Sequence, residues 1–114
     1  MINKVILVGR LTADPEVKTS GKGVQVAKVR VATNSYTGKD EEGNRREHTE
    51  LHILVLFGRQ AEVAGGYLRK GNLLYAEGRI QTNKWDDAEG KPHSITEVIV
   101  DSFQILSPKA ATAA

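Results

Sequence analysis

The aromatic side chains of this chain are few, and most of them lie beside a cation. Trp85, the only tryptophan, directly follows Lys84, and Phe57 is two residues before Arg59. Tyr36 stands at the start of a long polar segment. A nucleobase offers a flat π-face and its phosphate offers a negative charge, so rings next to Lys or Arg suit a single nucleic-acid strand. For any one pair, a core ring beside a surface cation is the simpler interpretation, and the placement of the pairs on strands must decide.

Residue patterns typical of catalysis or metal binding are not found in the sequence. His48 and His52 stand four residues apart in a predicted strand, roughly 13 Å along it, which is too far to share a metal ion. Residues 21–23 (GKG) lack the upstream glycine and the following Ser or Thr of a phosphate loop. The acidic residues between 86 and 89 lack the spacing of a calcium loop. We therefore expect a non-catalytic protein with no cofactor, no metal site and no catalytic residue.

The size and composition of the chain indicate one domain. It has 114 residues, of which 39% are hydrophobic and 26% are charged, and it has no cysteine. No apolar run approaches 18 residues and the first residues do not resemble a signal peptide, so we expect no membrane span and a cytoplasmic location. Residues 1–107 should form the domain, and residues 108–114 have too little apolar bulk to order themselves.

The distribution of charge says more than the net charge of +2. Residues 1–39 hold seven Lys or Arg against two acids, and residues 59–85 hold five against two. Residues 40–50 and 86–101 hold five acids each. Folding could bring the two cationic stretches together as one basic face, as in nucleic-acid binders, although solvated surface charge explains the same pattern.

Alternating apolar and polar residues predict five strands, over residues 3–11, 24–33, 48–57, 73–82 and 93–106. In the second of these, Ala27, Val29 and Val31 should point inward, with Lys28 and Arg30 on the outer side. A bulge or a sharp bend is expected near residues 26–27, where the parity of the valines changes. In the fourth strand the inward positions should be residues 74, 76, 78 and 80.

The remaining segments predict one helix and three connections. Residues 59–70 carry a helical apolar stripe that Gly71 should end. Residues 12–23 indicate a turn and hairpin region, and residues 34–47 a flexible loop or an extended hairpin tip. Residues 83–92 should be a turn-rich tip that carries Trp85.

Three strands, one short helix and two further strands predict an all-β, five-stranded Greek-key barrel with the helix between strands 3 and 4, which is the OB-fold. If the loops close over the sheet, the rings of Tyr36, Phe57 and Trp85 would surround a groove. The cations expected to line that groove are Arg10, Lys28, Arg30, Arg59, Arg79 and Lys84.

Six segments, in the right order and spacing, resemble the bacterial single-stranded DNA-binding protein family. They are residues 3–11 (NKVILVGRL), 14–16 (DPE), 49–59 (TELHILVLFGR), 61–64 (AEVA), 67–71 (YLRKG) and 77–85 (EGRIQTNKW). The resemblance implies an OB-fold that coats single-stranded DNA without sequence preference during replication, recombination and repair. It also implies a nucleoid-associated homotetramer built from dimers.

The same resemblance assigns roles to individual residues. It implies that Tyr36, Phe57 and Trp85 stack on bases. It implies that the cations near the DNA include Arg59, Lys70 and Lys84. It also implies a subunit interface that involves residues 3–8 and His52, including Asn3, Lys4, Val5 and Ile6.

Two departures from the family pattern stand out. Leu51 occupies a position where many bacterial members have tryptophan, so one stacking platform is reduced to an aliphatic contact. The linker and acidic tip that recruit replication and repair proteins in the family are also absent, and the sequence leaves open whether the chain is trimmed or naturally short. Two rival functions are an OB-fold adaptor that mainly contacts proteins and a nuclease on the same fold.

Overall fold

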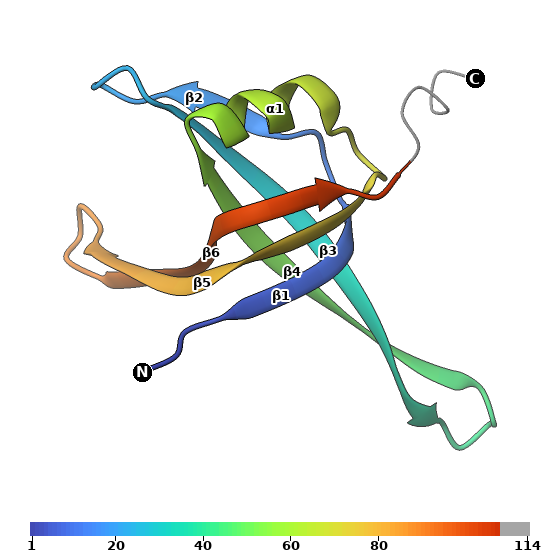
Figure 1. Cartoon of the computed structure of the whole chain (residues 1–114). Helices are drawn as coiled ribbons and strands as arrows, with labels where there is room; N and C mark the ends of the chain where they lie inside the picture. Colours follow the sequence, from blue (N-terminus) through green and yellow to red (C-terminus); the bar gives the residue numbers. More distant parts are fainter. Residues whose placement is uncertain (108–114) are drawn as a thin grey trace.

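The computed structural model describes residues 1–107, which form six strands and one helix (Figure 1). In chain order these elements are β1 (Val5–Leu11), β2 (Glu16–Thr19), β3 (Gln25–Lys39), β4 (Arg45–Phe57), α1 (Arg59–Tyr67), β5 (Leu73–Asp86) and β6 (Pro92–Ile105). The C-terminal segment that we predicted to be disordered, residues 108–114, lies outside the described residues. Within residues 1–107, no helix has the length and hydropathy that a membrane crossing requires.

The sheet closes into a barrel. Its strand order is β1-β5-β6-β4-β3-β2, and β1 also pairs with β3 through Arg10 and Leu11. The β4–β6 pair is parallel and the other pairs are antiparallel. Five strands therefore form the barrel, with β2 beside β3, and α1 lies between β4 and β5 in the chain. The predicted OB-fold is confirmed.

Side chains from alternate positions along the strands fill the barrel, because successive side chains of a strand point to opposite faces. Ala27, Val29 and Val31 are buried and the residues between them are exposed, as predicted. In β4 the buried interior positions are Leu54 and Leu56. Each buried Val or Leu contributes about 1.5–3 kcal/mol of hydrophobic stabilisation, so the interior holds the fold together and leaves the opposite face of β3 and β4 to other roles.

Helix α1 covers one end of the barrel (Figure 1). It begins after Gly58, whose φ of 61° favours glycine, and it buries Ala61 and Ala64. It ends at Tyr67 rather than at the predicted residue 70, because Leu68 has already turned to an extended conformation. Gly65 lies where an added Cβ would be 2.8 Å from the side chain of Val17, so its lack of a side chain lets β2 pack against the helix.

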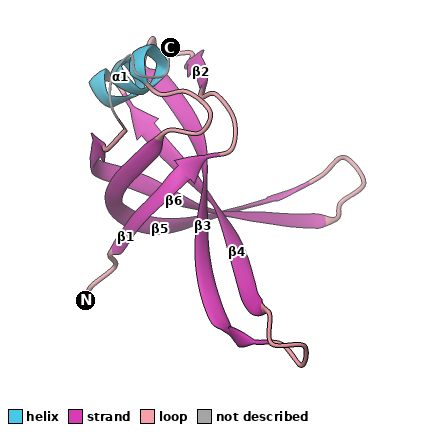
Figure 2. Cartoon of the chain, turned by 90° about the vertical axis from the view of Figure 1, so that its right-hand side faces the viewer, coloured by secondary structure: helices cyan, strands magenta, loops and turns pink. Residues whose placement is uncertain are grey.

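Beyond the barrel, two hairpins extend as arms that diverge in both views (Figures 1 and 2). We name residues 33–50 the β3–β4 arm and residues 80–97 the β5–β6 arm. The prediction of an extended hairpin for residues 34–47 is confirmed, since only residues 40–44 form the turn. The tip predicted for residues 83–92 is present but shorter, because β5 continues to Asp86, β6 begins at Pro92 and only residues 87–91 form the turn. Trp85 therefore lies on a strand.

Three other details differ from the sequence-based predictions. The register of β3 with β4 is continuous from Val26 to Tyr36, so there is no bulge at residues 26–27. Ile80 keeps the inward direction of Ala76 but is 48% exposed, because β5 leaves the barrel at that point. Residues 16–19, expected as a turn and hairpin region, form β2 through pairing with the first residues of β3.

Candidate nucleic-acid interface

The register of β3 and β4 places several predicted site residues on one face of the sheet. Residues directly opposite each other in an antiparallel pair share a face, and every second residue along a strand joins them. Phe57 lies opposite Val26, and Lys28, Arg30 and Tyr36 follow at even intervals along β3. These four side chains therefore lie on the side of the sheet that faces away from the barrel interior, which we name the outer face.

The outer face continues across β6 to β5. Val55 of β4 lies beside Ile99 of β6, and Ile99 lies opposite Arg79 of β5. Farther along the same two strands, Trp85 lies opposite His93 at an even interval from Ile99. Arg79 and Trp85 thus share the outer face with the residues of β3 and β4.

Polar contacts tie these strands together on that face. The carboxylate of Glu97, which is buried, lies 3.5 Å from Lys28 Nζ and accepts a hydrogen bond of 2.8 Å from Asn83 Nδ2. Lys28 belongs to β3, Asn83 to β5 and Glu97 to β6. The outer face is therefore one connected surface.

All three predicted rings are accessible. The exposed fractions are 62% for Tyr36, 46% for Phe57 and 50% for Trp85. The alternative interpretation of Phe57 as a core residue was wrong, because β4 directs Leu54 and Leu56 into the interior and Phe57 away from it. At about 3.3 Å per residue, Tyr36 lies roughly 33 Å along β3 from the residue opposite Phe57.

The cations of the outer face are paired with carboxylates. Besides Lys28 with Glu97, Arg30 Nη1 lies 3.3 Å from Glu16 Oε1, and Arg79 Nη1 lies 3.8 Å from Asp101 Oδ1. The Arg30 and Arg79 pairs are solvent-exposed on both sides, and such pairs are worth only about 0–1 kcal/mol. A phosphate can therefore displace those two carboxylates, while the net positive charge of the face stays modest.

The other predicted cations are placed differently. Arg10 is bound to the carbonyl of Gly71 at the β1–β3 seam. Arg59, at the start of α1, pairs with Glu62 at 3.3 Å. Lys70 lies in the connection after α1, where Asp14 accepts a hydrogen bond from its backbone N–H. Lys84 has the opposite parity to Trp85, so it points to the other side of the β5–β6 arm and is not part of the outer face.

Three residues that our sequence analysis did not select complete the surface. The guanidinium of Arg45 lies over the Tyr36 ring, with Cζ 5.1 Å from the centroid. The ring of His93 stacks on Trp85. Lys18, with Lys28 and Arg30, lines a cavity of about 340 Å³ beside β2. Recognition of residues 34–47 and 83–92 as paired strands would have placed Arg45 and His93 near the two rings.

Leu51, the residue found in place of the family's tryptophan, also lies on the outer face. It is opposite Ala32 and is 68% exposed. An exposed leucine beside an alanine offers a base an apolar contact but no π-face. The sheet at the base of the β3–β4 arm is therefore weaker for stacking than the arm itself at Tyr36.

The residues predicted for a subunit interface lie mostly on β1 and its N-terminal extension. Asn3 exchanges two hydrogen bonds of 2.9 Å with the backbone of Ile80, and Lys4 Nζ lies 3.0 Å from Glu77. Through their hydrogen bond, Glu77 raises the pKa of Lys4 and Lys4 lowers the pKa of Glu77. Val5 is half-buried and packs against the core, while Ile6 is 60% exposed.

His52 lies elsewhere, on the inward side of β4, where its Nε2 is 2.9 Å from the hydroxyl of Thr33. Across residues 1–107, no group of three or more His, Cys, Asp or Glu side chains is arranged to hold a metal ion. What the arrangement on the outer face can do is stack aromatic rings on flat ligands and neutralise nearby anions.

Comparison with known proteins identifies the family of this chain. Residues 2–106 match the model of the single-strand binding protein family. The structure of Plasmodium falciparum SSB in complex with ssDNA superposes with a TM-score of 0.85 at 28% identity, covering 94% of this chain and 97% of that chain.

A deletion mutant of the single-stranded DNA-binding protein from Thermus aquaticus is 32% identical, with a TM-score of 0.80. The match covers 96% of this chain and 52% of the Thermus chain, so this chain spans about half the length of that relative. With nearly all of its described residues matched, the chain belongs to the single-strand binding protein family.

Proposed function

We propose that this protein binds and coats single-stranded DNA of any sequence by stacking its rings on bases and pairing its cations with phosphates. Proteins of this family are non-catalytic. The observation that carries the proposal is the joint placement of Tyr36, Phe57 and Trp85, all exposed, on one continuous face with Lys28 and Arg30. A relative of the same fold is seen in complex with ssDNA.

The arrangement of the rings supports binding without sequence preference. Each stacked base contributes about 1–3 kcal/mol, and every base has a π-face. The rings are also far apart: by strand spacing, Trp85 lies roughly 20 Å from the point where β6 pairs with β4. A ligand must therefore be long and flexible to reach all three, which fits an unpaired strand better than a short ligand or a stiff duplex.

The direct test is a fluorescence titration, because Trp85 is the only tryptophan. We expect oligo-dT to quench its emission and mixed-sequence single strands to bind with similar affinity, while duplex DNA binds much more weakly. A duplex that binds as tightly as its separated strands, or emission that does not change at saturation, would contradict the proposal.

Salt dependence tests the ionic part separately. If all seven candidate cations neutralised a phosphate each, the log–log slope with salt would be about −5. Three of them, Lys28, Arg30 and Arg79, lie on the outer face, and if only these acted the slope would be about −2. We expect a value between these limits, and a slope near zero would remove the cations from the mechanism.

Self-association belongs to the same proposal. On β1, Ile6 and Val8 expose apolar side chains next to each other on one face, and β1 pairs with β3 only through Arg10 and Leu11 among the described residues. We propose that this strand contributes to a dimer and that dimers assemble into a homotetramer, so that one long strand can follow several outer faces. Light scattering of Ile6→Glu, expected to give smaller assemblies than the wild type, tests this step.

We further propose that the coated strands are those exposed in the cytoplasm and nucleoid during replication, recombination and repair. Loss of strand protection from a nuclease in a Trp85→Ala, Tyr36→Ala double variant would connect the coating activity to that role.

A further inference from the structure

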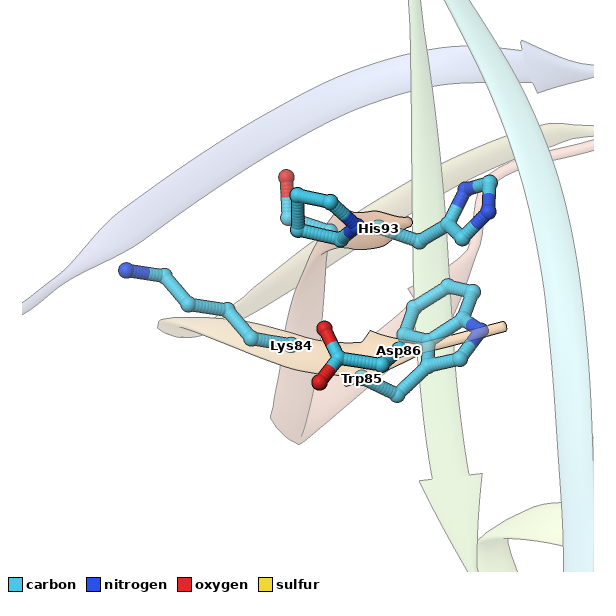
Figure 3. Close-up of a pocket in the computed structure, with 6 residues that line it drawn as sticks. Lys84, Trp85, Asp86 and His93 are labelled. Carbon is cyan, nitrogen blue, oxygen red and sulfur yellow. The ribbon is translucent and has the colours of Figure 1, made fainter. Parts of the chain in front are cut away.

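The Trp85 ring is not held by its own strand alone. His93, directly opposite on β6, stacks on it with a centroid distance of 5.6 Å and an interplanar angle of 20° (Figure 3). Trp85 is nevertheless half exposed. The imidazole therefore covers one face of the indole and leaves ring surface available to a base. The cavity beside the pair measures about 590 Å³, and Figure 3 shows Lys84 directed away from the two rings.

His93 is itself held in place. Its Nε2 lies 2.8 Å from Oδ2 of Asp87, in the turn of the β5–β6 arm. The other oxygen of Asp87 accepts hydrogen bonds from the backbone N–H groups of Glu89 and Lys91. The hydrogen bond from His93, followed by that from Lys91, lowers the pKa of Asp87, so this carboxyl stays ionised in mildly acidic solution. One carboxylate thus closes the turn and orients the imidazole.

We propose that His93 is the positioning residue for Trp85 in strand binding and that its protonation adds a positive charge beside the bound strand. This inference rests on the proposed function. A ring fixed before binding loses less conformational freedom when a base stacks on it, so support of the indole from behind raises affinity.

Five charged residues of the β5–β6 arm lie close to His93 along the chain. From β5, Lys84 and Asp86 line the same cavity, and the turn contributes Asp87, Glu89 and Lys91. Of these five groups, Asp87 bonds the imidazole, whereas Lys84 and Asp86 have the opposite parity to Trp85 and point to the other side of the arm. Histidine changes charge within the range in which proteins work, so the β5–β6 arm gains a cation as the pH falls.

Two substitutions separate ring support from charge. His93→Ala removes both, and we expect it to weaken oligo-dT binding about two- to tenfold at about pH 8, the range for loss of an aromatic pair, and by a further two- to fivefold at about pH 5.5. His93→Phe keeps a ring and cannot titrate. We expect it to match the wild type at about pH 8 and to fall behind by about two- to fivefold at about pH 5.5.

The salt dependence of oligo-dT affinity tests whether His93 contributes a positive charge. Between about pH 8 and about pH 5.5, the slope of the wild type should steepen by roughly 0.7 more than that of His93→Phe, as expected for one added phosphate contact. Oligo-dT suits this comparison because thymine has no group that titrates in that range. A merely structural role for His93 would leave the difference in slope at zero.

His48→Phe is the matched control. His48 also bonds a carboxylate, Glu50 at 2.9 Å, but it lies on the side of the β3–β4 arm opposite to Tyr36. We expect its affinity and pH profile to follow the wild type. In a second readout that needs no DNA, Trp85 emission of the wild type should fall as the pH is lowered, since a protonated imidazole in contact quenches indole, and that of His93→Phe should not.

The outcomes are distinct. If the wild type binds oligo-dT and His93→Ala binds it equally tightly, only the inference about His93 is overturned. So does a His93→Phe variant whose pH profile and salt slope equal those of the wild type. Wild-type protein that fails to bind oligo-dT overturns the proposed function, and this inference with it.

Discussion

The two arms of this protein are built alike and end in the same turn. In the β3–β4 arm, Asp40 Oδ1 accepts hydrogen bonds from the backbone N–H groups two and four residues later. In the β5–β6 arm, Asp87 Oδ1 does the same. A glycine with φ near 80° stands three residues after each aspartate, at Gly43 and Gly90, where the backbone favours a residue without a side chain.

The arms differ in what supports their rings. Tyr36 is covered by the guanidinium of Arg45, which is charged at every accessible pH, and Trp85 is covered by His93, which can lose its proton. The turn aspartate also differs between the arms: Asp87 bonds the supporting His93, whereas the carboxylate of Asp40 bonds the backbone of its own turn. One scaffold thus carries a permanent and a titratable version of the same support.

Removal of the rings should give the largest effects. We expect Tyr36→Ala and Trp85→Ala each to weaken binding to a long oligo-dT by about 1–3 kcal/mol. Because the rings lie on different arms with no shared contact, the double variant should lose the sum within about 0.5 kcal/mol. Isothermal titration of the four proteins checks this.

A shorter oligonucleotide is the control for that cycle. For a DNA strand that reaches only one arm, only one of the two substitutions should lower the binding affinity. If Tyr36→Ala changes nothing on any length, the bound strand follows the β5–β6 arm alone, and the arms are not equivalent in function.

The two arms also show which parts of the fold could be predicted from the sequence and which could not. Alternation in residues 27–31 is strong, since buried Ala and Val alternate with Lys and Arg, and it correctly predicted which of these side chains point inward and which outward. Residues 34–39 and 83–86 are polar on both faces, because beyond the barrel neither face is buried. Such segments carry no period-two signal, so they resemble loops although their hydrogen bonds are those of strands.

The partners of the site residues were harder to predict than the residues themselves. Arg45 and His93 acquire their roles from cross-strand register, which depends on where each turn begins, and a shift of one residue would move them to the other face. The two Asp-x-x-Gly sequences, at residues 40–43 and 87–90, were the available signal. The ion pairs of Lys28 and Arg30 depend on Glu97 and Glu16 from strands far along the chain, and no local pattern indicates them.

Replacement of the turn aspartates should separate the arms by a middle-sized effect. Asp40→Ala and Asp87→Ala each remove two backbone hydrogen bonds, so amide exchange at each arm tip should rise about two- to tenfold per bond lost. Only Asp87→Ala also releases His93, so only this variant should lower oligo-dT affinity clearly. Equal losses of affinity would mean that the tips contact DNA directly.

The pH dependence of folding stability should also distinguish Asp87→Ala from the wild type. The pKa of Asp87 is lowered in the folded protein, mainly by the hydrogen bond from His93. Its stabilising effect is therefore fully present above the unfolded-state value of about 3.9 and is lost as the pH falls through the lower folded value. In acid, the difference in unfolding temperature between wild type and Asp87→Ala should shrink, and a difference that grows would contradict this assignment.

Leu51→Trp should strengthen stacking at the base of the β3–β4 arm. Leu51 is exposed on the outer face opposite Ala32, so the larger ring meets no core residue and can lie flat on the strand. We expect oligo-dT binding to tighten by about 1 kcal/mol, the lower end for one stacked base, with thermal stability unchanged. Leu51→Gln, of similar length but without a ring, is the control and should not tighten binding.

Arg45 should show the smallest effect and the clearest contrast with His93. An exposed cation–π contact is worth about 0.5–1 kcal/mol, so Arg45→Gln should weaken oligo-dT binding about two- to fivefold, and Arg45→Lys should recover part of the loss because it restores the charge without the planar group. Since arginine does not titrate, the deficit of Arg45→Gln should be the same at about pH 8 and about pH 5.5, whereas that of His93→Phe should appear only in acid. If the loss of affinity in Arg45→Gln depended on pH, the pH response would not be confined to the β5–β6 arm. Its source would then be a titratable group outside His93.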